Sequence, residues 1–382
     1  MRRTLAHDLC QPRMTRAVAG MGTAMRIVVT GATGNVGSRL VPQLLADPRV
    51  TSVVGIARRL PDDPDPRAEW QARDIAADDL SGVVRGADVV VHLAWLLQPA
   101  HDPDEMRRVN LVGTQRLLDA VAETGVPALV HASSVGAYSP GPCGPDGTKL
   151  RVDESHPTAG ISSSTYSRHK ARAERMLDTF EQEHPERRVV RLRPGVVLQG
   201  DAASELSRYF LGAFVPQSLV RPGLIPVVPA VDRLAVQVVH ASDMAAAYVL
   251  ACVEPVTGAF NIATEPVLDP PALAAILGAR QVPVPAPVLR GLIDLTWRLH
   301  LQPTDPGWVD IGRLTPLLDT SRARTVLGWT PEHDAAQALL ETLEAMSAGQ
   351  GGDSPVMRPR ARGTARLLEV VKPFLPGARG NG

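Results

Sequence analysis

A glycine-rich turn between an apolar strand and a helix constrains this chain more than any other feature. The turn, Gly31-Ala-Thr-Gly34-Asn-Val-Gly37, follows the apolar run at 26–30 and precedes a segment of helical period at 36–46. Glycines let such a turn close and let the backbone approach a pyrophosphate. The pyrophosphate then rests on the helix N-terminus, where free N–H groups and the helix dipole favour anions. The sequence therefore predicts a dinucleotide-binding unit; a purely structural glycine turn is the alternative.

The rest of the chain repeats the alternation of strand and helix. Apolar runs bounded by Gly, Pro and Asp alternate with helical-period segments, a pattern typical of strand-helix units on a parallel sheet. The run at 89–93 is apolar without alternation, as expected for a strand covered on both faces. We predict an α/β protein with a doubly wound parallel sheet. Strands are expected at 26–30, 52–57, 89–93, 128–132 and 189–193, and helices at 36–46, 110–123 and 164–183.

The pattern loosens beyond Gly200, where proline becomes frequent. Segments 236–252 and 259–263 are still expected to return to the main sheet. Both ends of the chain have compositions typical of disorder, the second being rich in Gly, Pro and Arg. We therefore predict a disordered leader at 1–24, a dinucleotide-binding domain at 25–200 and 235–263, a substrate-binding lobe at 201–234 and 264–347, and a disordered tail at 348–382.

Charge and cysteine content narrow the class of partner. Forty basic and forty acidic side chains cancel, which argues against a protein that binds nucleic acid or a membrane surface through a net basic field. No stretch approaches the roughly 18 apolar residues of a membrane span. Cys10, Cys143 and Cys252 lie far apart without a metal-ligand spacing, so we expect no disulfide framework and no metal site. A small-molecule substrate and a cytoplasmic location are expected.

The stretch Tyr166-Ser-Arg-His-Lys170 pairs a phenol with an ammonium group one helical turn away. Residues at i and i+4 share a helix face. An opposite charge favours the ionised phenol, whose ordinary pKa is about 10, and so should bring its pKa towards neutral. A proton-transfer group is most useful near the operating pH. Together with the glycine turn, this pair indicates a nicotinamide-dependent redox enzyme.

Several ordered motifs extend the pattern over most of residues 25–345. They are Gly31-x-x-Gly34-x-x-Gly37, Val91-His-Leu-Ala94, Asn110-Leu-Val-Gly113-Thr114, His131-Ala-Ser-Ser134-Val-Gly-Ala-Tyr138, Tyr166-x-x-x-Lys170, Arg193-Pro194-Gly195 and Leu327-Gly328-Trp329. With these motifs the chain resembles the extended branch of the short-chain dehydrogenase/reductase superfamily, also called the NAD-dependent epimerase/dehydratase family. The resemblance implies a Rossmann-type doubly wound sheet with a smaller C-terminal substrate lobe.

The same resemblance implies residue roles. Ser134 would hydrogen-bond the substrate oxygen, with Ser133 in the neighbouring non-catalytic position. Tyr166 would be the acid/base, and Lys170 would reach the cofactor ribose and stabilise the phenolate. The implied cofactor contacts are Gly31, Thr33, Gly34, Asn35, Val36, Gly37, Arg58, Asp74, Ile75, Leu93, Ala94, Asn110, Tyr166, Lys170 and Pro194.

The type of dinucleotide is predicted from the end of the second strand. About 20 residues after the last glycine, an acidic residue holds a ribose 2′-hydroxyl, whereas Arg accommodates a 2′-phosphate. Arg58 and Arg59 stand there, and Asp62 comes too late. We therefore favour NADP(H) as the cofactor, with NAD(H) as the alternative. Asp74 would accept a hydrogen bond from the adenine amine.

Three activities remain open within the resemblance. A dehydratase would carry Asp-Glu directly after Ser134, where this chain has Val135-Gly136. A nucleotide-sugar epimerase usually has Asn at the position of Val196. We favour an NAD(P)-dependent oxidoreductase that acts on a carbonyl or alcohol, over a nucleotide-sugar epimerase. A non-catalytic dinucleotide-binding sensor is the alternative of another class, although such proteins usually lose the Tyr or the Lys. A homodimer is expected from the resemblance alone.

Overall fold

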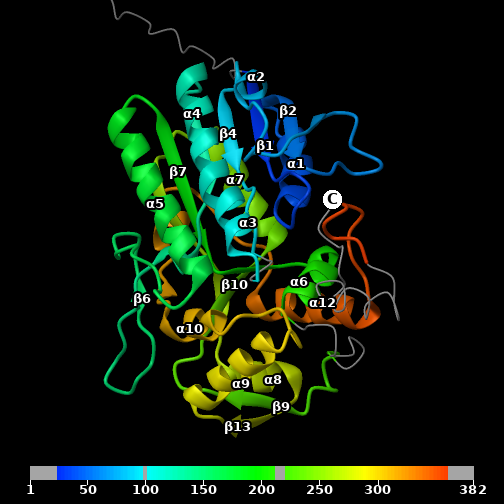
Figure 1. Cartoon of the computed structure of the whole chain (residues 1–382), viewed down its shortest axis with the longest axis vertical. Coiled ribbons are helices and arrows are strands. Elements are labelled where there is room, and N and C mark those ends of the chain that lie inside the picture. Colours follow the sequence, from blue (N-terminus) through cyan, green and yellow to red (C-terminus); the bar gives the residue numbers. More distant parts are fainter. Residues whose placement is uncertain (1–23, 98–100, 211–219, 360–382) are drawn as a thin grey trace, which may run out of the picture.

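The computed structural model describes residues 24–97, 101–210 and 220–359. One part is an α/β unit around a parallel sheet, and the other is a smaller lobe (Figure 1). Apart from residue 24, the predicted leader lies outside the described residues. Residues 360–382 of the predicted tail also lie outside them.

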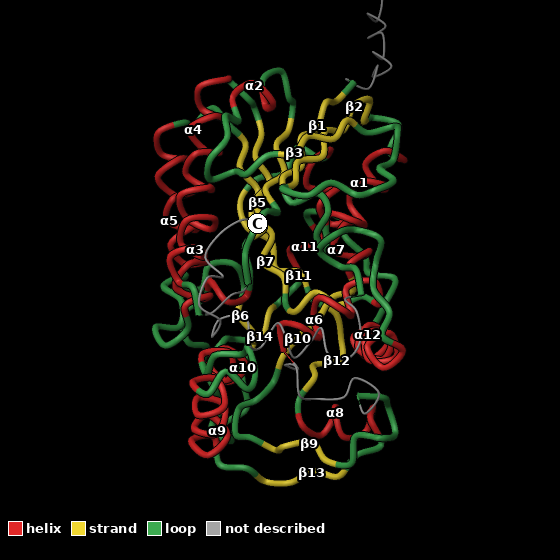
Figure 2. The backbone as a smooth tube through the Cα atoms, turned by 45° about the vertical axis from the view of Figure 1, so that its right-hand side comes forward, coloured by secondary structure: helices red, strands yellow, loops and turns green. Residues whose placement is uncertain are grey.

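The main sheet has seven strands, all parallel, in the order β11-β7-β5-β4-β1-β2-β3. Figure 2 draws its strands in yellow between two groups of red helices. The predicted Rossmann-type doubly wound fold is therefore confirmed. The strand order reverses between β1 and β4, and ligands of open α/β sheets bind at such a switch point, beyond the carboxyl ends of the strands. The strands are β1 Met25–Thr30, β2 Val50–Ala57, β3 Glu69–Ala72, β4 Val89–His92, β5 Ala128–Ala132, β7 Arg188–Pro194 and β11 Gly258–Ile262.

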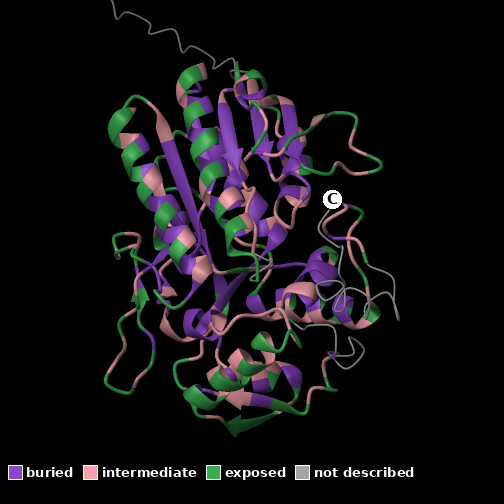
Figure 3. Ribbon diagram, in the orientation of Figure 1, coloured by how far each residue is buried: buried purple, intermediate pink, exposed green. Residues whose placement is uncertain are grey.

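Helices cover both faces of this sheet, and Figure 3 shows its central strands buried between them. Ile27 and Val29 pack in the core cluster under α1 and α7, whereas Val28 packs in the cluster under α4 and α5. Successive strand residues point to opposite faces, so the uninterrupted apolar run of β1 serves both cores. The helices are α1 Gly37–Ala46, α7 Ala241–Val253 and α11 Ser321–Thr325 on one side, and α2 Ser81–Val84, α4 Thr114–Thr124 and α5 Thr165–Glu183 on the other.

Two elements differ from the sequence-based expectation. The helix expected at 110–123 is preceded by α3 (Pro103–Arg107) and a π-helical turn (Arg108–Gly113) before α4. The side chain of Asp102 caps α3 by accepting a hydrogen bond from Glu105 N at 3.0 Å. This earlier helix start was not predicted. The strand β3 was not predicted, because this edge strand is half exposed and short.

The strand expected to return to the main sheet at 236–240 does not do so. β10 (Val236–His240) pairs with β8 (Val196–Leu198) and β12 (Thr264–Leu268) in a separate three-stranded sheet. The chain leaves the main sheet at Gly195, where an added Cβ would lie 2.2 Å from Gln237 O. β8 is thereby directed towards β10. The expected return at 259–263 is confirmed, because β11 pairs with β7.

The remaining elements build the smaller lobe and its connections. They are α6 Ala203–Phe210, β9 Val227–Ala230, α8 Pro270–Leu277, β13 Arg280–Pro283, α9 Ala286–Arg298, α10 Gly307–Leu314 and α12 Ala335–Ala348, with the short pair β6 Arg151–Val152 and β14 Leu317–Leu318 and 3₁₀ turns at Val135–Ala137 and Gly200–Ala202.

The predicted disorder from residue 348 is wrong for residues 348–359. α12 ends at Ala348 and is capped by Gly349. Beyond it, Gly352 N donates to Asp201 O at 2.7 Å, and Met357 is buried against α6 and α12. Arg358 forms an ion pair with Asp62 at 2.5 Å. The Gly- and Pro-rich composition concealed these attachments, which include the buried side chain of Met357.

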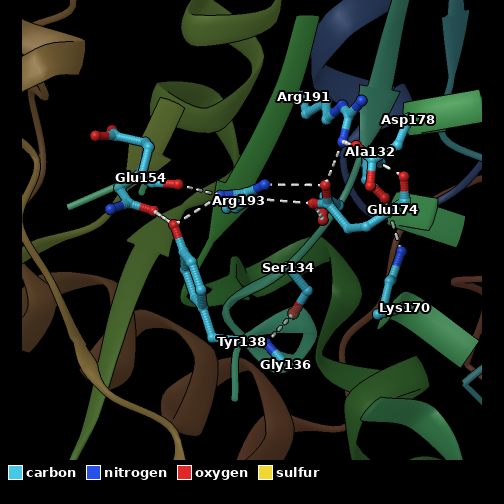
Figure 4. Close-up of polar contacts among 12 residues, drawn as sticks. Ala132, Ser134, Gly136, Tyr138, Glu154, Lys170, Glu174, Asp178, Arg191 and Arg193 are labelled. Atoms are coloured by element: carbon cyan, nitrogen blue, oxygen red, sulfur yellow. Dashed lines mark hydrogen bonds and ion pairs between the residues drawn. The ribbon is translucent and has the colours of Figure 1, made fainter. Parts of the chain in front are cut away.

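A buried carboxylate fastens α5 to the sheet (Figure 4). Glu174 is fully buried and accepts from Arg191 Nη1 at 2.9 Å and from Arg193 Nε and Nη2 at 2.8 and 2.9 Å. Ser133 Oγ donates to the same carboxylate at 2.5 Å. Burial alone would raise the pKa of Glu174, but Arg193 and Arg191 lower it to about 2. This ion cluster fixes α5 against β7 and against the end of β5.

Arg193 extends the cluster to the segment that follows β5. Its Nη1 donates to Tyr138 Oη at 3.0 Å and to Glu154 O at 2.9 Å. Tyr138 Oη in turn donates to Asn261 Oδ1 on β11 at 2.7 Å. The cluster therefore links three strands and one helix near the carboxyl edge of the sheet.

We predict that Glu174→Gln lowers the free energy of unfolding by about 3–5 kcal/mol, because it leaves the buried guanidinium group of Arg193 without a carboxylate partner among the described residues. Arg191 keeps its ion pairs with Asp178 and Glu181. Glu183→Gln, at an exposed position of the same helix, is the matched control and should change it by less than about 0.5 kcal/mol. Urea unfolding of both variants measures the difference. The folded-state pKa is lowered, so the contribution should be complete above the ordinary pKa of 4.5 and disappear as pH falls towards about 2. Equal stability of the two variants would contradict the assignment.

Candidate active site

The glycine turn packs against the end of β4 and leaves one side open. Gly31 has a left-handed backbone (φ +73), and an added Cβ would lie 2.7 Å from Ala94 N. An added Cβ at Gly37 would lie 2.5 Å from Gly31 O, so this glycine allows α1 to pack closely on the turn. At Gly34 the nearest atom to an added Cβ is Gly31 O at 3.4 Å. No side chain caps the N-terminus of α1, although Ser38 N and Arg39 N already donate to Gly34 O and Val36 O.

A pocket beside this turn brings together eight of the predicted cofactor residues. Arg59, Arg73, Trp95, Glu205, Tyr209 and Val356 also line it. Sequence analysis did not identify the last five of these. They come from separate parts of the chain, and no local motif marks them. The eight predicted residues are Gly31, Thr33, Gly34, Arg58, Asp74, Ile75, Leu93 and Ala94.

Other predicted cofactor residues do not line this pocket. Asn35 donates from Nδ2 to Val197 O at 3.0 Å and accepts from Gln199 at 2.8 Å, so its side chain ties the turn to β8. Asn110 is buried, and its amide bonds both backbone groups of Leu96 at 2.7 and 2.9 Å. An amide side chain can hydrogen-bond a ligand or a backbone group. In this structure the amides of Asn35 and Asn110 both bond backbone groups. Val36, Gly37 and Pro194 also lie outside the pocket wall.

Basic groups gather at the β2 end of the pocket. Arg58 is 3.7 Å from Glu105, with its side chain 46% exposed. Among the described residues, neither Arg59 nor Arg73 has a carboxylate within 4.0 Å. Burial would raise the pKa of Asp74, but Ala76 N–H and Arg108 lower it below its usual value. The carboxylate of Asp74 is therefore ionised and already occupied by two donors.

Ser134, Tyr166 and Lys170 come together at the carboxyl edge of the sheet. Tyr166 lies in the first turn of α5, and its ring passes so close to Gly136 that an added Cβ there would be 2.8 Å from Tyr166 Cε1. Ser134 accepts from Gly136 N at 3.0 Å and hydrogen-bonds the Tyr166 hydroxyl. Lys170 Nζ donates to Ala132 O at 2.7 Å (Figure 4). The side chain of Ser133 turns away to Glu174.

The ionisation of this pair differs from the sequence-based expectation. Burial raises the pKa of the Tyr166 phenol to about 12, although its hydrogen bond with Ser134 lowers it. Burial also lowers the pKa of Lys170 to about 7, although the charge of Glu174 raises it. The ammonium lies 5.9 Å from the Tyr166 ring centroid and points to Ala132 O. Desolvation therefore outweighs the hydrogen bond at Tyr166 and the opposite charge near Lys170 in this conformation.

Aromatic side chains surround Tyr166. Trp308, from α10 of the smaller lobe, stacks on its ring with centroids 5.0 Å apart. Phe210, at the end of α6, meets Trp308 edge to face at 5.2 Å, and Trp95 meets Tyr166 in the same manner at 6.4 Å. Sequence analysis did not identify this aromatic cluster, because three separate segments assemble it.

Neither a metal site nor a membrane span is found in the part of the chain that the structure describes. Its His, Cys, Asp and Glu side chains do not gather in groups of three or more that could hold a metal ion. None of its helices is both long and apolar enough to cross a membrane.

Comparison with known proteins gives a consistent family. Residues 27–263 match the model of the NAD dependent epimerase/dehydratase family. An uncharacterized protein of Mycobacterium tuberculosis is 29% identical over 320 residues, which cover 82% of this chain and 29% of that protein. The chain thus spans under a third of the length of the first curated relatives.

Two further comparisons cover nearly the whole of the matched protein. The dTDP-6-deoxy-L-talose 4-dehydrogenase (NAD(P)(+)) of Kitasatospora kifunensis is 29% identical over 84% of this chain and 96% of that enzyme. The solved structure of UDP-glucose 4-epimerase from Thermotoga maritima superposes with a TM-score of 0.64, at 20% identity over 85% of this chain and 99% of that one. At this identity the structural likeness concerns the fold.

Proposed function

The chain belongs to the NAD-dependent epimerase/dehydratase family, and we propose that it is an oxidoreductase that moves a hydride between NADP(H) and an apolar carbonyl or alcohol. The single observation that carries this proposal is the aromatic surrounding of the Ser134-Tyr166-Lys170 group, above all the stacking of Trp308 on Tyr166. A buried diphosphate would need charge-assisted partners to offset its desolvation. Aromatic rings supply apolar contact instead.

The pocket residues fit a dinucleotide. The open side of Gly34 and the uncapped N-terminus of α1 suit a pyrophosphate. Arg58, Arg59 and Arg73 line the β2 end of the pocket, where their charge suits a 2′-phosphate. Asp74 and Ile75 line the same region and would contact the adenine. The bound dinucleotide supplies the nicotinamide ring that gives or accepts the hydride.

The chain's own residues would move the proton. Ser134 and Tyr166 hydrogen-bond each other, so one substrate oxygen placed between their hydroxyls could bond both. Tyr166 would donate its proton to that oxygen in reduction and accept it in oxidation. Lys170 lies one turn along the same helix and is buried, with the whole residue 3% exposed. Its positive charge would favour the Tyr166 phenolate that proton donation leaves.

Further assignments belong to the same proposal. Residues 25–200 and 235–263 would bind the dinucleotide, and 201–234 with 264–347 the substrate, although β10 contributes to the sheet of the smaller lobe. A cytoplasmic location is supported by the unbonded Cys143 and Cys252. A homodimer is proposed from family membership alone. A non-catalytic sensor is disfavoured, because Ser134, Tyr166 and Lys170 are all present and adjacent.

Tyr166→Phe should reduce turnover by at least about 100-fold, because loss of a positioned acid/base costs roughly 10²–10⁴ in rate. Affinity for NADPH should stay within about twofold, since the ring still packs between Trp95 and Trp308. Turnover is measured with a panel of aliphatic and aromatic ketones and alcohols, and cofactor binding by fluorescence titration. Retention of more than about a tenth of wild-type turnover would remove Tyr166 from the acid/base role.

NADPH should bind at least about tenfold more tightly than NADH, because hydrogen bonds to charged groups contribute roughly 1.5–3 kcal/mol. Arg58→Ala should remove most of this difference. Arg175→Ala, an exposed position on α5, is the matched control and should preserve it. Both cofactors are titrated at one ionic strength. If NADPH and NADH bind with equal affinity, and Arg58→Ala changes neither affinity, the predicted preference for NADP(H) is wrong. Arg58 would then be a side chain that faces solvent without contacting the cofactor.

The NADP-loaded protein should not bind UDP-glucose or dTDP-glucose with micromolar affinity in calorimetry. The reason is the aromatic surrounding of Tyr166, together with Val196 where an epimerase usually has Asn. Micromolar binding of either compound would contradict this expectation and support the epimerase. Arg221 or Arg233 would then be the first residues to test as a diphosphate clamp.

A further inference from the structure

Trp95 lies between the dinucleotide pocket and the ammonium of Lys170. The residue follows β4 and lines the pocket. Its ring centroid is 3.5 Å from Lys170 Nζ, and its edge-to-face contact with Tyr166 spans 6.4 Å. The pocket wall includes neither Tyr166 nor Lys170. The pocket therefore extends along the arginine-bearing end and stops at the indole.

The indole holds this position without a hydrogen bond. Trp95 Nε1 is buried and has no hydrogen-bond partner among the described residues, and an unpaired buried donor is costly. Lys170 carries three N–H donors, and within the described part of the chain one of them is paired, with Ala132 O. The indole face covers the ammonium in place of further oxygen acceptors. Both polar groups would gain if an oxygen-bearing ligand replaced this contact.

The backbone around Trp95 is anchored, so only its side chain can move readily. Leu93 N donates to Thr30 O at 3.0 Å, and both backbone groups of Leu96 bond the amide of Asn110. Displacement of the indole therefore requires rotation about the side-chain torsions of a single residue. Such rotations are fast compared with the movement of a loop.

We propose that the indole of Trp95 acts as a plug over the ammonium of Lys170. A whole dinucleotide must displace this plug, whereas an adenosine fragment need not. This inference rests on the proposed function, because it assumes that the pocket binds a dinucleotide. Displacement consumes part of the binding energy, so it lowers the apparent affinity for the whole dinucleotide. A fragment that occupies only the arginine-bearing end does not incur this loss. Trp95 thereby sets the relative affinity for dinucleotides and their adenosine halves.

The test compares two ligands in two variants. NADPH and 2′,5′-ADP share the phosphorylated adenosine, and the second has no nicotinamide half. Trp95→Ala should bind NADPH at least about fivefold more tightly than the wild type and 2′,5′-ADP within about twofold. Trp297→Ala is the matched control. Trp297 is also a half-buried Trp with an unpaired indole N–H, but it lies on α9, outside the pocket wall. It should leave both affinities within about twofold.

Two additions keep the outcome decisive. Trp95→Leu retains an apolar side chain and replaces the alanine variant if that variant does not fold. In the wild type, NADPH should change tryptophan emission excited at the indole band more than 2′,5′-ADP does, and Trp95→Phe should reduce this difference. These readouts do not depend on turnover.

The failures of the two proposals are distinguishable. If Trp95→Ala weakens NADPH binding, or changes both affinities equally, Trp95 is a fixed wall and the plug is overturned. NADH and 5′-AMP are titrated in parallel. If NADH and 5′-AMP bind but NADPH and 2′,5′-ADP do not, the predicted preference for NADP(H) is wrong. The comparison of NADH with 5′-AMP then tests the plug in the same way. Absence of binding by all four nucleotides would overturn the proposed function and the plug with it.

Discussion

The buried carboxylate of Glu174 is the interaction on which the geometry of the site depends. It lies one turn beyond Lys170 on α5 and binds Arg191 and Arg193 of β7. A buried ion pair adds little stability over apolar packing, but removal of one partner is costly. Its value is therefore positional. It fixes the rotation of α5, and with it the direction in which Tyr166 and Lys170 face, and through Ser133 it sets the end of β5 beside Ser134.

The group formed by Ser134, Tyr166 and Lys170 is largely shielded from water. Burial moves the pKa of Tyr166 and that of Lys170 towards their uncharged forms. Trp95 and Trp308 contribute to this burial, because the indole of Trp95 lies over the ammonium and that of Trp308 stacks on the phenol ring. In a low-dielectric surrounding each electrostatic interaction is stronger than in water. A ligand that brings hydroxyl groups to Lys170 would therefore change the ionisation of the whole group, and the ionisation of the resting site need not be that of the loaded one.

Sequence reasoning predicted the parts of this molecule that have a local pattern. Both ends of the strand β5 were predicted at the observed residues, and the ends of the other four expected strands were predicted within two residues. Apolar runs bounded by turn residues can be recognised directly in the sequence. The roles of Asn35 and Asn110 were not predicted, since their amides bind backbone groups that only the fold brings near. The aromatic cluster and the pKa of Lys170 also depend on tertiary burial. Propensity and spacing contain no information on how far a side chain is removed from water.

The segment at 349–359 contacts both the pocket and the smaller lobe, so ligand binding in the pocket can be coupled to the attachment of this segment. Val356 lines the pocket beside the glycine turn, while its neighbour Met357 packs against α12 and Arg358 forms an ion pair with Asp62 beyond β2. The segment thus belongs to the smaller lobe and to the pocket at once. Because linkage between two binding events is reciprocal, a ligand that gains contact with Val356 must tighten the attachment of this segment. Docking of the segment must, by the same factor, raise the affinity for that ligand.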